Sequence, residues 1–196
     1  MTRLGVYVQV PFCQTKCTYC NFHTGVFSKE LYAPYVRAVC REIAEIPRLL
    51  SENRIAGIPE AVVNTLYFGG GTPSLLEPAS LAQIIDVIRA SFPSQFEEVT
   101  LEADPETVSS QKADAWREAG FNRISMGVQS FDDAELHAAG RMHRRADVFE
   151  ATKILRAAGF GNLSFDLIAG LPHQTDRSWE DSVEQLLHLR PEHVSI

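Results

Sequence analysis

The sequence of 196 residues predicts an α/β fold, a partial (β/α)6 barrel that stops in its sixth strand. Strand-like runs alternate with helical patterns, and such alternation predicts parallel strands joined by crossover helices. Each run also has one apolar face and one polar or small face. A doubly wound sheet buries both faces, and a closed eight-stranded barrel fills its interior with apolar side chains. An incomplete barrel with a wet or ligand-filled lumen fits the polar face better than either.

The six strands are expected where every second residue is apolar, at 4–10, 63–69, 98–104, 123–130, 162–169 and 193–196. The apolar face then consists of Val6, Val8, Val10, Leu66, Phe68, Val99, Leu101, Ile124, Met126, Val128, Leu163, Phe165, Leu167, Val194 and Ile196. The opposite face runs from Tyr7 on the first strand to His193 on the last. A sheet with one solvated face is the alternative, but parallel sheets rarely leave a face open.

Five helical patterns separate these strands, at 30–53, 78–92, 109–119, 145–158 and 176–189. In the first pattern, Val36, Cys40 and Ile43 stand at i, i+4 and i+7, which makes an apolar stripe. Cys40 is therefore expected to be a small buried hydrophobic residue rather than a metal ligand. Gly120 and Gly159 follow two of the patterns just before a strand, where a glycine often ends a helix.

Composition and charge exclude several classes of protein. The net charge is −7, and no long basic run suggests a surface for nucleic acid. No apolar run reaches the ~18 residues of an integral membrane segment. The first ten residues form a strand pattern rather than a secretory signal. We therefore expect a cytoplasmic protein, in which four cysteines indicate metal binding or catalysis sooner than disulfides.

Three of the cysteines, Cys13, Cys17 and Cys20, lie in the segment PFCQTKCTYCNFHT directly after the first strand. A [4Fe–4S] cluster with three cysteine ligands would keep one iron open for a chelating small molecule. Zinc held by the three thiolates and His23 is a second interpretation, although such sites usually join two separated ligand pairs. A redox pair of Cys17 and Cys20 is the third, and it leaves Cys13 without a role. The spacing favours the open cluster.

Polar and glycine residues also mark the ends of the later strands. GGGTPS, residues 69–74, follows the second strand, and Glu102, Gln129 and Asp166 stand at the ends of the next three. In a parallel barrel the carboxyl ends of the strands share one rim, where sites are built from several strands. The sequence therefore predicts one site that combines the cysteine loop with these residues, which a zinc site on a single loop would not require.

The motifs, taken in order, resemble the radical S-adenosylmethionine (SAM) superfamily, and within it the HemN/HemW group. They are YVQVPFCQTKCTYCNFHT, YFGGGTPSLL, EADPETV, GFNRISMGVQSFDDAELHAAGRMHRR and GFGNLSFDLIAGLPHQT. The group contains oxygen-independent coproporphyrinogen III oxidases and HemW haem chaperones. The resemblance implies a TIM-like partial barrel of the radical SAM type and a radical SAM core domain over residues 1–196. The C-terminal domain of the group is absent from this chain, which we expect to be part of a longer protein.

The resemblance implies that Cys13, Cys17 and Cys20 hold a [4Fe–4S] cluster whose open iron binds SAM. Because SAM needs that iron, His23 is expected not to be a ligand. In the superfamily an electron donor reduces the cluster, which then splits SAM into methionine and a 5′-deoxyadenosyl radical. The positions that match the SAM- and ligand-binding residues of the group are Tyr7, Tyr19, Gly70, Gly71, Thr72, Glu102, Gln129, Arg141 and Asp166.

For several of these residues a plainer role is the alternative. Tyr19 matches an aromatic position at the adenine and Tyr7 would point into the lumen, but either could pack simply in the protein. Arg141 would pair with a carboxylate of SAM or substrate, or be a solvated arginine. Asp166 would bind ligand or belong to a structural ion pair. Asp104, directly before Pro105, is expected to be a turn residue.

Glycines and the acidic residue at the end of the third strand have more specific expected roles. Gly70 and Gly71, followed by Thr72, would let the backbone approach the methionyl part of SAM closely. Glu102 would accept hydrogen bonds from SAM, since a buried carboxylate needs such a partner. Gln9 departs from the histidine that is usual in the first motif of the group.

The residues after Cys20 separate the two branches of the group. The oxidases typically extend their motif to C-x3-C-x2-C-x-C, whereas Asn21 and Phe22 stand here and the fourth cysteine is absent. This favours a HemW-type chaperone, which would bind the cluster, SAM and haem as cargo and deliver haem to apo-proteins. The alternatives are the oxidase, acting on a porphyrinogen, and a zinc-stapled binding module. The resemblance alone does not decide whether the chain is an enzyme.

Overall fold

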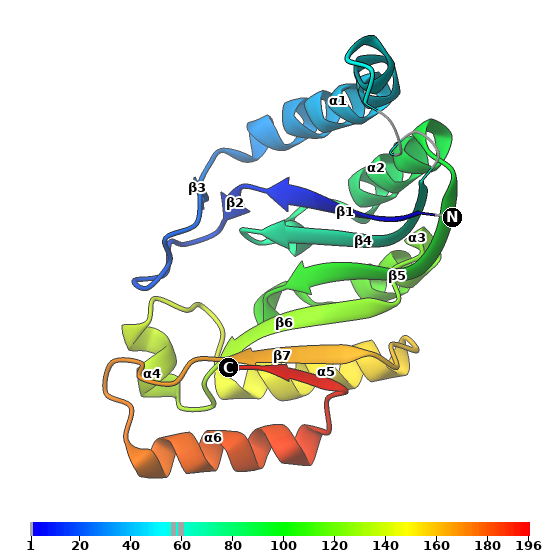
Figure 1. The fold of residues 1–196 in the computed structure, drawn as a ribbon. Coiled ribbons are helices and arrows are strands. Elements are labelled where there is room, and N and C mark those ends of the chain that lie inside the picture. The colour runs from blue at the N-terminus through cyan, green and yellow to red at the C-terminus, as the bar shows by residue number, and fades with distance from the viewer. Residues whose placement is uncertain (1, 56–57, 59–60) are drawn as a thin grey trace.

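The computed structural model describes residues 2–55, 58 and 61–196, and its main feature is a six-stranded parallel sheet (Figure 1). The strands are β1 (Arg3–Val10), β4 (Val62–Gly70), β5 (Ser94–Ala103), β6 (Arg123–Gln129), β7 (Leu163–Leu167) and β8 (His193–Ser195). They are adjacent in the order β1-β4-β5-β6-β7-β8, so each strand pairs with the next in the sequence. All six point to the same edge of the curved sheet (Figure 1). The predicted α/β partial barrel is confirmed.

Five long helices cover the outer face of the sheet (Figure 1). They are α1 (Tyr32–Glu52), α2 (Pro78–Ser91), α3 (Ser110–Ala119), α5 (Arg145–Ala157) and α6 (Asp176–Leu189). Each lies within a few residues of its predicted range. Gly120 and Gly159 adopt positive φ angles of 101° and 85° just after α3 and α5. These are left-handed conformations that glycine takes without steric cost, which is why each helix stops there.

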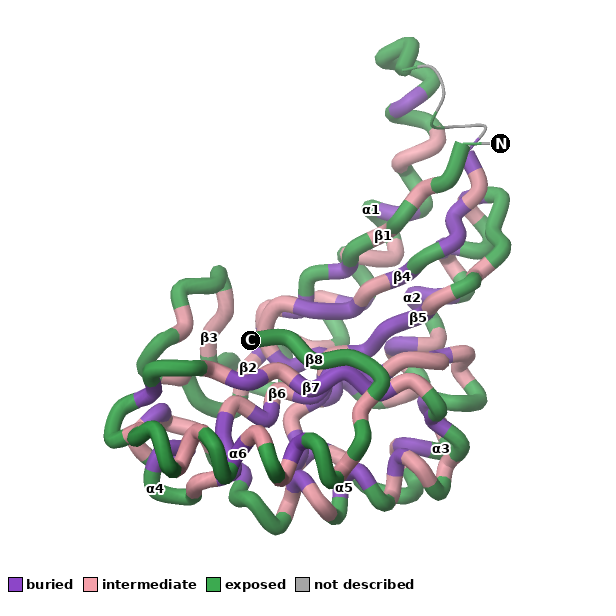
Figure 2. The backbone as a smooth tube through the Cα atoms, turned by 60° about the horizontal axis from the view of Figure 1, so that its bottom comes forward, coloured by how far each residue is buried: buried purple, intermediate pink, exposed green. Residues whose placement is uncertain are grey.

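The core lies between the sheet and the helices, where most of the predicted apolar face is buried (Figure 2). The largest fully buried side chains include Phe68, Trp116, Phe121, Phe160 and Phe165. The rings of Phe68 and Phe121 meet edge to face with their centroids 5.3 Å apart. Cys40 is only half-buried, although it packs against this core as the helical stripe predicts.

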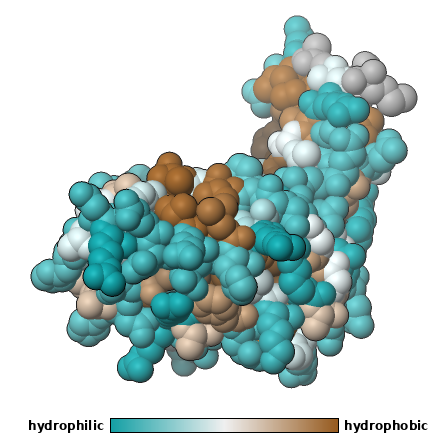
Figure 3. Space-filling model, turned by 90° about the horizontal axis from the view of Figure 1, so that it is seen from below, coloured by the Kyte–Doolittle hydropathy of each residue, from teal (hydrophilic) through white to brown (hydrophobic). Residues whose placement is uncertain are grey.

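The apolar face of the last strand differs from the prediction. Val194 is 36% exposed and Ile196 is 75% exposed, so neither belongs to the buried core. β8 is the last strand of the sheet, with a neighbouring strand on one side only, and all three of its residues are exposed. Figure 3 views the molecule from the side on which α6 lies in Figure 1. The surface seen from this side is mostly hydrophilic, and it contains one apolar patch.

Three small elements that the sequence did not predict, two short strands and one short helix, frame the cysteine loop. The short strands β2 (Phe12–Cys13) and β3 (Gly25–Val26) pair in parallel and close the base of the loop. A short helix, α4 (Asp133–Ala138), follows β6. Its N-cap is Asp132, whose carboxylate accepts hydrogen bonds from the backbone N–H groups of residues 134 and 135 at 2.8 and 3.1 Å.

Candidate functional site

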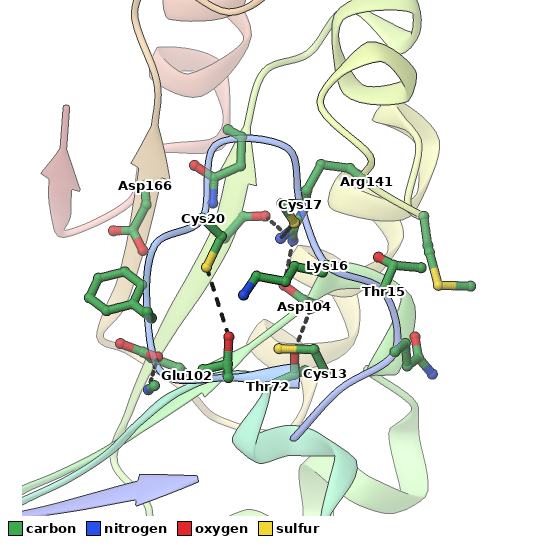
Figure 4. A pocket seen from close by; sticks show the side chains of 18 of the residues that line it. Cys13, Thr15, Lys16, Cys17, Cys20, Thr72, Glu102, Asp104, Arg141 and Asp166 are labelled. Atoms are coloured by element: carbon green, nitrogen blue, oxygen red, sulfur yellow. Dashed lines mark hydrogen bonds and ion pairs between the residues drawn. The ribbon is translucent and has the colours of Figure 1, made fainter. Parts of the chain in front are cut away.

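A cavity of about 420 Å³ lies where the carboxyl ends of the strands meet the cysteine loop (Figure 4). The loop lines it with Cys13, Gln14, Thr15, Lys16, Cys17, Tyr19, Cys20, Asn21, Phe22 and Thr24. The barrel contributes Gly70, Gly71, Thr72, Glu102, Ala103, Asp104, Glu106, Ser125, Gly127, Gln129, Arg141, Met142 and Asp166. Of the twelve predicted site residues, eleven therefore line one cavity, and Tyr7 does not.

The cysteine loop is fastened on two sides. At its base the N–H of Gly25 donates to the carbonyl of Pro11 at 2.9 Å, beside the β2–β3 pair. On the far side Thr18 N–H donates to the carbonyl of Ala139 at 3.1 Å, and the Thr15 hydroxyl donates to the carbonyl of Gly140 at 3.1 Å. The segment after α4 thus holds the middle of the loop, which positions the cysteines relative to the barrel.

The glycine segment after β4 runs against the start of this loop. The N–H of Gly71 donates to the carbonyl of Val10, and that of Thr72 donates to the carbonyl of Phe12, both at 2.7 Å. Gly70 has a φ of 113°, a conformation that favours glycine. A Cβ on Gly71 would lie 2.5 Å from the carbonyl oxygen of Phe12 and 3.0 Å from Sγ of Cys13. Glycine is therefore required for this close approach.

Gly71→Ala is expected to destabilise the fold by about 1–3 kcal/mol, because the new Cβ overlaps backbone that cannot move cheaply. It is also expected to displace Cys13 and to lower iron binding. Gly161→Ala is the matched control, because nothing lies within 4 Å of that Cβ position. Urea unfolding and iron analysis of both variants check the prediction. Equal behaviour of the two variants would contradict it.

Glu102 is held at the cavity wall by a tyrosine and a backbone N–H. The Tyr67 hydroxyl donates to Oε1 of Glu102 at 2.8 Å, and the N–H of Gly70 donates to Oε2 at 3.0 Å. Burial raises the pKa of Glu102, and these two hydrogen bonds oppose the rise. Tyr7 is 56% exposed and does not line the cavity; it stacks on Tyr67, with the ring centroids 5.6 Å apart.

Arg141 and Asp104 form a buried ion pair, which rules out the alternative of a solvated Arg141 and adds a second role to the turn predicted for Asp104. The Arg141 guanidinium donates to Asp104, to the carbonyl of Gly127 at 2.9 Å, and to Sγ of Cys17 at 3.6 Å. Its side chain is only 9% exposed, so it is not a solvated arginine. Asp104 does begin a 3-10 turn, but its carboxylate also accepts a hydrogen bond from the Thr72 hydroxyl at 2.8 Å.

The remaining predicted residues lie around this pair. Tyr19 is 36% exposed, and burial of its hydroxyl together with nearby Cys17 raises its pKa. Gln129 has a φ of 64°, which is uncommon outside glycine and often marks functional sites. Burial raises the pKa of Asp166, while the positive charge of Arg123 opposes the rise. Asp166 forms no ion pair among the described residues.

The donor set fits a cluster better than a single metal ion. Among the residues that the structure describes, no three His, Cys, Asp or Glu side chains converge closely enough to hold one ion. The three thiols instead stand apart around the cavity (Figure 4). His23 is exposed and does not line it. Three soft sulfur ligands beside a cavity of ligand size suit an iron–sulfur cluster with room for a small molecule.

Sequence reasoning did not identify Tyr67, which holds Glu102, or Glu106, which lines the cavity. It also did not predict that the Asp104 carboxylate lines the cavity. Asp104 and Glu102 share the polar face of one strand, so the period of two pointed to both. Tyr67 also lies on the polar face, but no pattern indicates that its hydroxyl reaches Glu102 on the neighbouring strand.

The fold and the site define an α/β partial-barrel protein with a thiol-lined cavity at the carboxyl ends of its parallel strands. A family model described as "Radical SAM superfamily" matches residues 7–186. The chain belongs to the radical SAM superfamily. Membership implies a [4Fe–4S] cluster and SAM as cofactors.

Curated relatives and a solved structure show which members of the superfamily the chain is similar to. The chain is 36% identical over 194 residues to "Heme chaperone HemW" of Bacillus subtilis, covering 98% of this chain and 49% of the relative. It is 37% identical over 196 residues to "Oxygen-independent coproporphyrinogen III oxidase" of Bradyrhizobium diazoefficiens, covering 98% and 42%. The structure of coproporphyrinogen III oxidase (HemN) from Escherichia coli matches with a TM-score of 0.86 and 28% identity, covering 99% and 44%.

These matches confirm the predicted similarity to the HemN/HemW group. The chain spans about half the length of the curated relatives it matches. No helix among the described residues is long and apolar enough to cross a membrane. The cytoplasmic location and the extent of the core domain stay predictions.

Proposed function

We propose that this chain is the radical SAM core of a HemW-type haem chaperone, which binds haem and delivers it to target apo-proteins. Curated HemW relatives from four bacteria, 32–38% identical over nearly the whole chain, support the proposal. The observation that carries it is the pair of residues after Cys20. Phe22 stands in the place of the fourth cysteine that is typical of the oxidases, Asn21 precedes it, and both line the cavity.

The residues of the cavity have separate roles in this proposal. Cys13, Cys17 and Cys20 would hold the cluster, which supplies the electron chemistry when bound. Gly70 and Gly71 would let the backbone meet the methionyl part of SAM, and Glu102 would accept hydrogen bonds from it. Here the Tyr67 and Gly70 donors fix the orientation of the Glu102 carboxylate before ligand arrives.

Arg141 was expected to pair with a carboxylate of SAM or substrate, but its contacts favour a different role. Asp104 already neutralises its guanidinium, so a ligand carboxylate would have to share Arg141 with Asp104. Its contact with Sγ of Cys17 instead places a fixed positive charge beside a proposed cluster ligand. Tyr19, Gln129 and Asp166 would complete the wall around SAM.

The oxidase remains the second candidate, because the Bradyrhizobium diazoefficiens relative and the HemN structure carry that name. A paired assay separates the two. The chain, reconstituted anaerobically with iron and sulfide, is titrated with haem and, separately, incubated with coproporphyrinogen III, SAM and a reductant. We expect haem binding near one per chain and no vinyl product. Vinyl formation would establish the oxidase instead, and loss of haem binding would overturn the chaperone assignment for this chain.

A further inference from the structure

A buried histidine and a half-buried glutamate lie close together beside the cavity, and neither has a role in the function proposed above. His143 has a fully buried side chain, and Glu106, in the 3-10 turn Pro105–Thr107 after β5, has a side chain that is 20% exposed. Nδ1 of His143 lies 3.6 Å from Oε2 of Glu106. Among the described residues neither of these two buried atoms has a hydrogen-bond partner. Glu106 also lines the cavity, so the pair connects the protein interior with the ligand space.

The other nitrogen of the ring fixes the protonation of His143. Nε2 lies 3.0 Å from the carbonyl oxygen of Val128, which can only accept, so Nε2 carries a hydrogen. In the neutral ring Nδ1 is then a bare acceptor. If Glu106 were ionised as well, two lone pairs would face each other in a buried space, which is costly. One additional proton between Nδ1 and Oε2 removes that conflict.

We propose that Glu106 and His143 share one proton in the wall of the cavity, and that this proton controls how strongly the cavity holds a cationic ligand. While Glu106 keeps the proton, the pair is electrically neutral. When the proton leaves to solvent, Glu106 adds a negative charge to a wall that already contains Glu102, Asp104 and Asp166. A cationic group in the cavity, such as a sulfonium, is then bound more tightly.

The surroundings place the proton on the carboxyl rather than on the ring. The charged groups that act on the pair are Asp104 and Arg141 on the cavity side and Asp147 on α5. Burial, aided by Asp104, raises the pKa of Glu106 to about 7. Burial and the positive charge of Arg141 lower the pKa of His143 to about 4. Near neutral pH the proton is therefore on Glu106, and it leaves as the pH rises through about 7.

The shared proton has a consequence for folding that needs no ligand. Between about pH 4.5 and 6.5 the unfolded chain carries this proton on histidine, and the folded chain carries it on Glu106, so the pair adds no pH dependence. In Glu106→Gln only the buried neutral histidine remains, and the unfolded state alone binds the proton. Relative to the wild type, the folding equilibrium of Glu106→Gln should shift roughly 40-fold toward the folded form as the pH rises from 4.5 to 6.5.

Two measurements on the 196-residue chain test the shared proton itself. Urea unfolding across pH 4.5–6.5 compares the wild type, Glu106→Gln and the exposed control Glu150→Gln. Nitrogen-15 NMR of His143 in the wild type is expected to show a neutral ring protonated at Nε2 at pH 5.5. Parallel pH dependence of all three proteins, or a charged His143 ring at pH 5.5, would overturn the proposal.

The link to a cationic ligand rests on the proposed SAM site and has its own test. SAM carries a sulfonium, and S-adenosylhomocysteine carries a neutral thioether in its place. For the reconstituted wild type, the preference for SAM over S-adenosylhomocysteine should rise at least about fivefold from pH 6 to 8. Glu106→Gln should abolish this rise, and Glu150→Gln should keep it.

The outcomes separate the two proposals. If neither compound binds, the SAM site is wrong, while unfolding and NMR still decide whether the proton is shared. If both compounds bind with a preference that does not change with pH, the control by Glu106 is wrong. The same conclusion follows if Glu106→Gln retains the wild-type pH dependence.

Discussion

Cys17→Ser is expected to abolish assembly of the iron–sulfur cluster, lowering bound iron from about four atoms per chain to nearly none. Cys17 lies in the middle of the loop, beside Arg141, and no other described cysteine lines the cavity apart from Cys13 and Cys20. A serine hydroxyl is a poor substitute for a thiolate ligand of iron. Iron and sulfide analysis after anaerobic reconstitution measures the loss.

Cys40→Ser is the matched control, because Cys40 lies on α1 and packs against the core away from the cavity. This variant is expected to bind as much iron as the wild type. If Cys17→Ser also retained the wild-type iron content, the assignment of the loop as the cluster site would be wrong.

Asp104→Asn is expected to lower the free energy of unfolding by about 3–5 kcal/mol, because it leaves the buried charge of Arg141 without a partner. The Arg141 side chain is 9% exposed, and water therefore cannot replace the lost carboxylate. The variant also weakens the acceptor of the Thr72 hydroxyl. Urea unfolding measures the change.

Two comparisons make this result specific. Glu45→Gln removes one partner of the exposed Arg48 and should leave the free energy of unfolding nearly unchanged. Asp104→Asn combined with Arg141→Met should recover part of the lost stability, because the unpaired charge is then absent. A loss in Asp104→Asn as small as that in Glu45→Gln would contradict a structural role for the ion pair.

The fold was predictable because the sequence shows clearly both the two-residue period of strands and the 3.6-residue period of helices. Alternating residues on β4, β6 and β7 indicate strands with a buried face, and the glycines at 120 and 159 mark where α3 and α5 end. The exposure of the last strand was not predictable, since alternation shows which residues share a face but not how deeply that face is buried. Val194 and Ile196 share the predicted apolar face, yet both are exposed.

The candidate site was predictable where the chain order alone brings residues together. The rim of a parallel barrel collects strand ends, so the cysteine loop, Glu102, Gln129 and Asp166 were expected to meet, and they line one cavity. Contacts between side chains of different segments were not predictable. The Asp104–Arg141 pair joins residues 37 positions apart, and the His143–Glu106 pair depends on a turn that no pattern marks.

The proposal that this cavity holds a cluster with an open iron and SAM beside it is tested most directly by electron paramagnetic resonance of the reduced, reconstituted chain. Adding SAM is expected to change the spectrum of the cluster, because SAM would bind the iron that has no cysteine ligand. In Cys17→Ser the signal should be absent. A wild-type chain that takes up about one zinc instead of iron, or a cluster spectrum that SAM leaves unchanged, would contradict the proposed site.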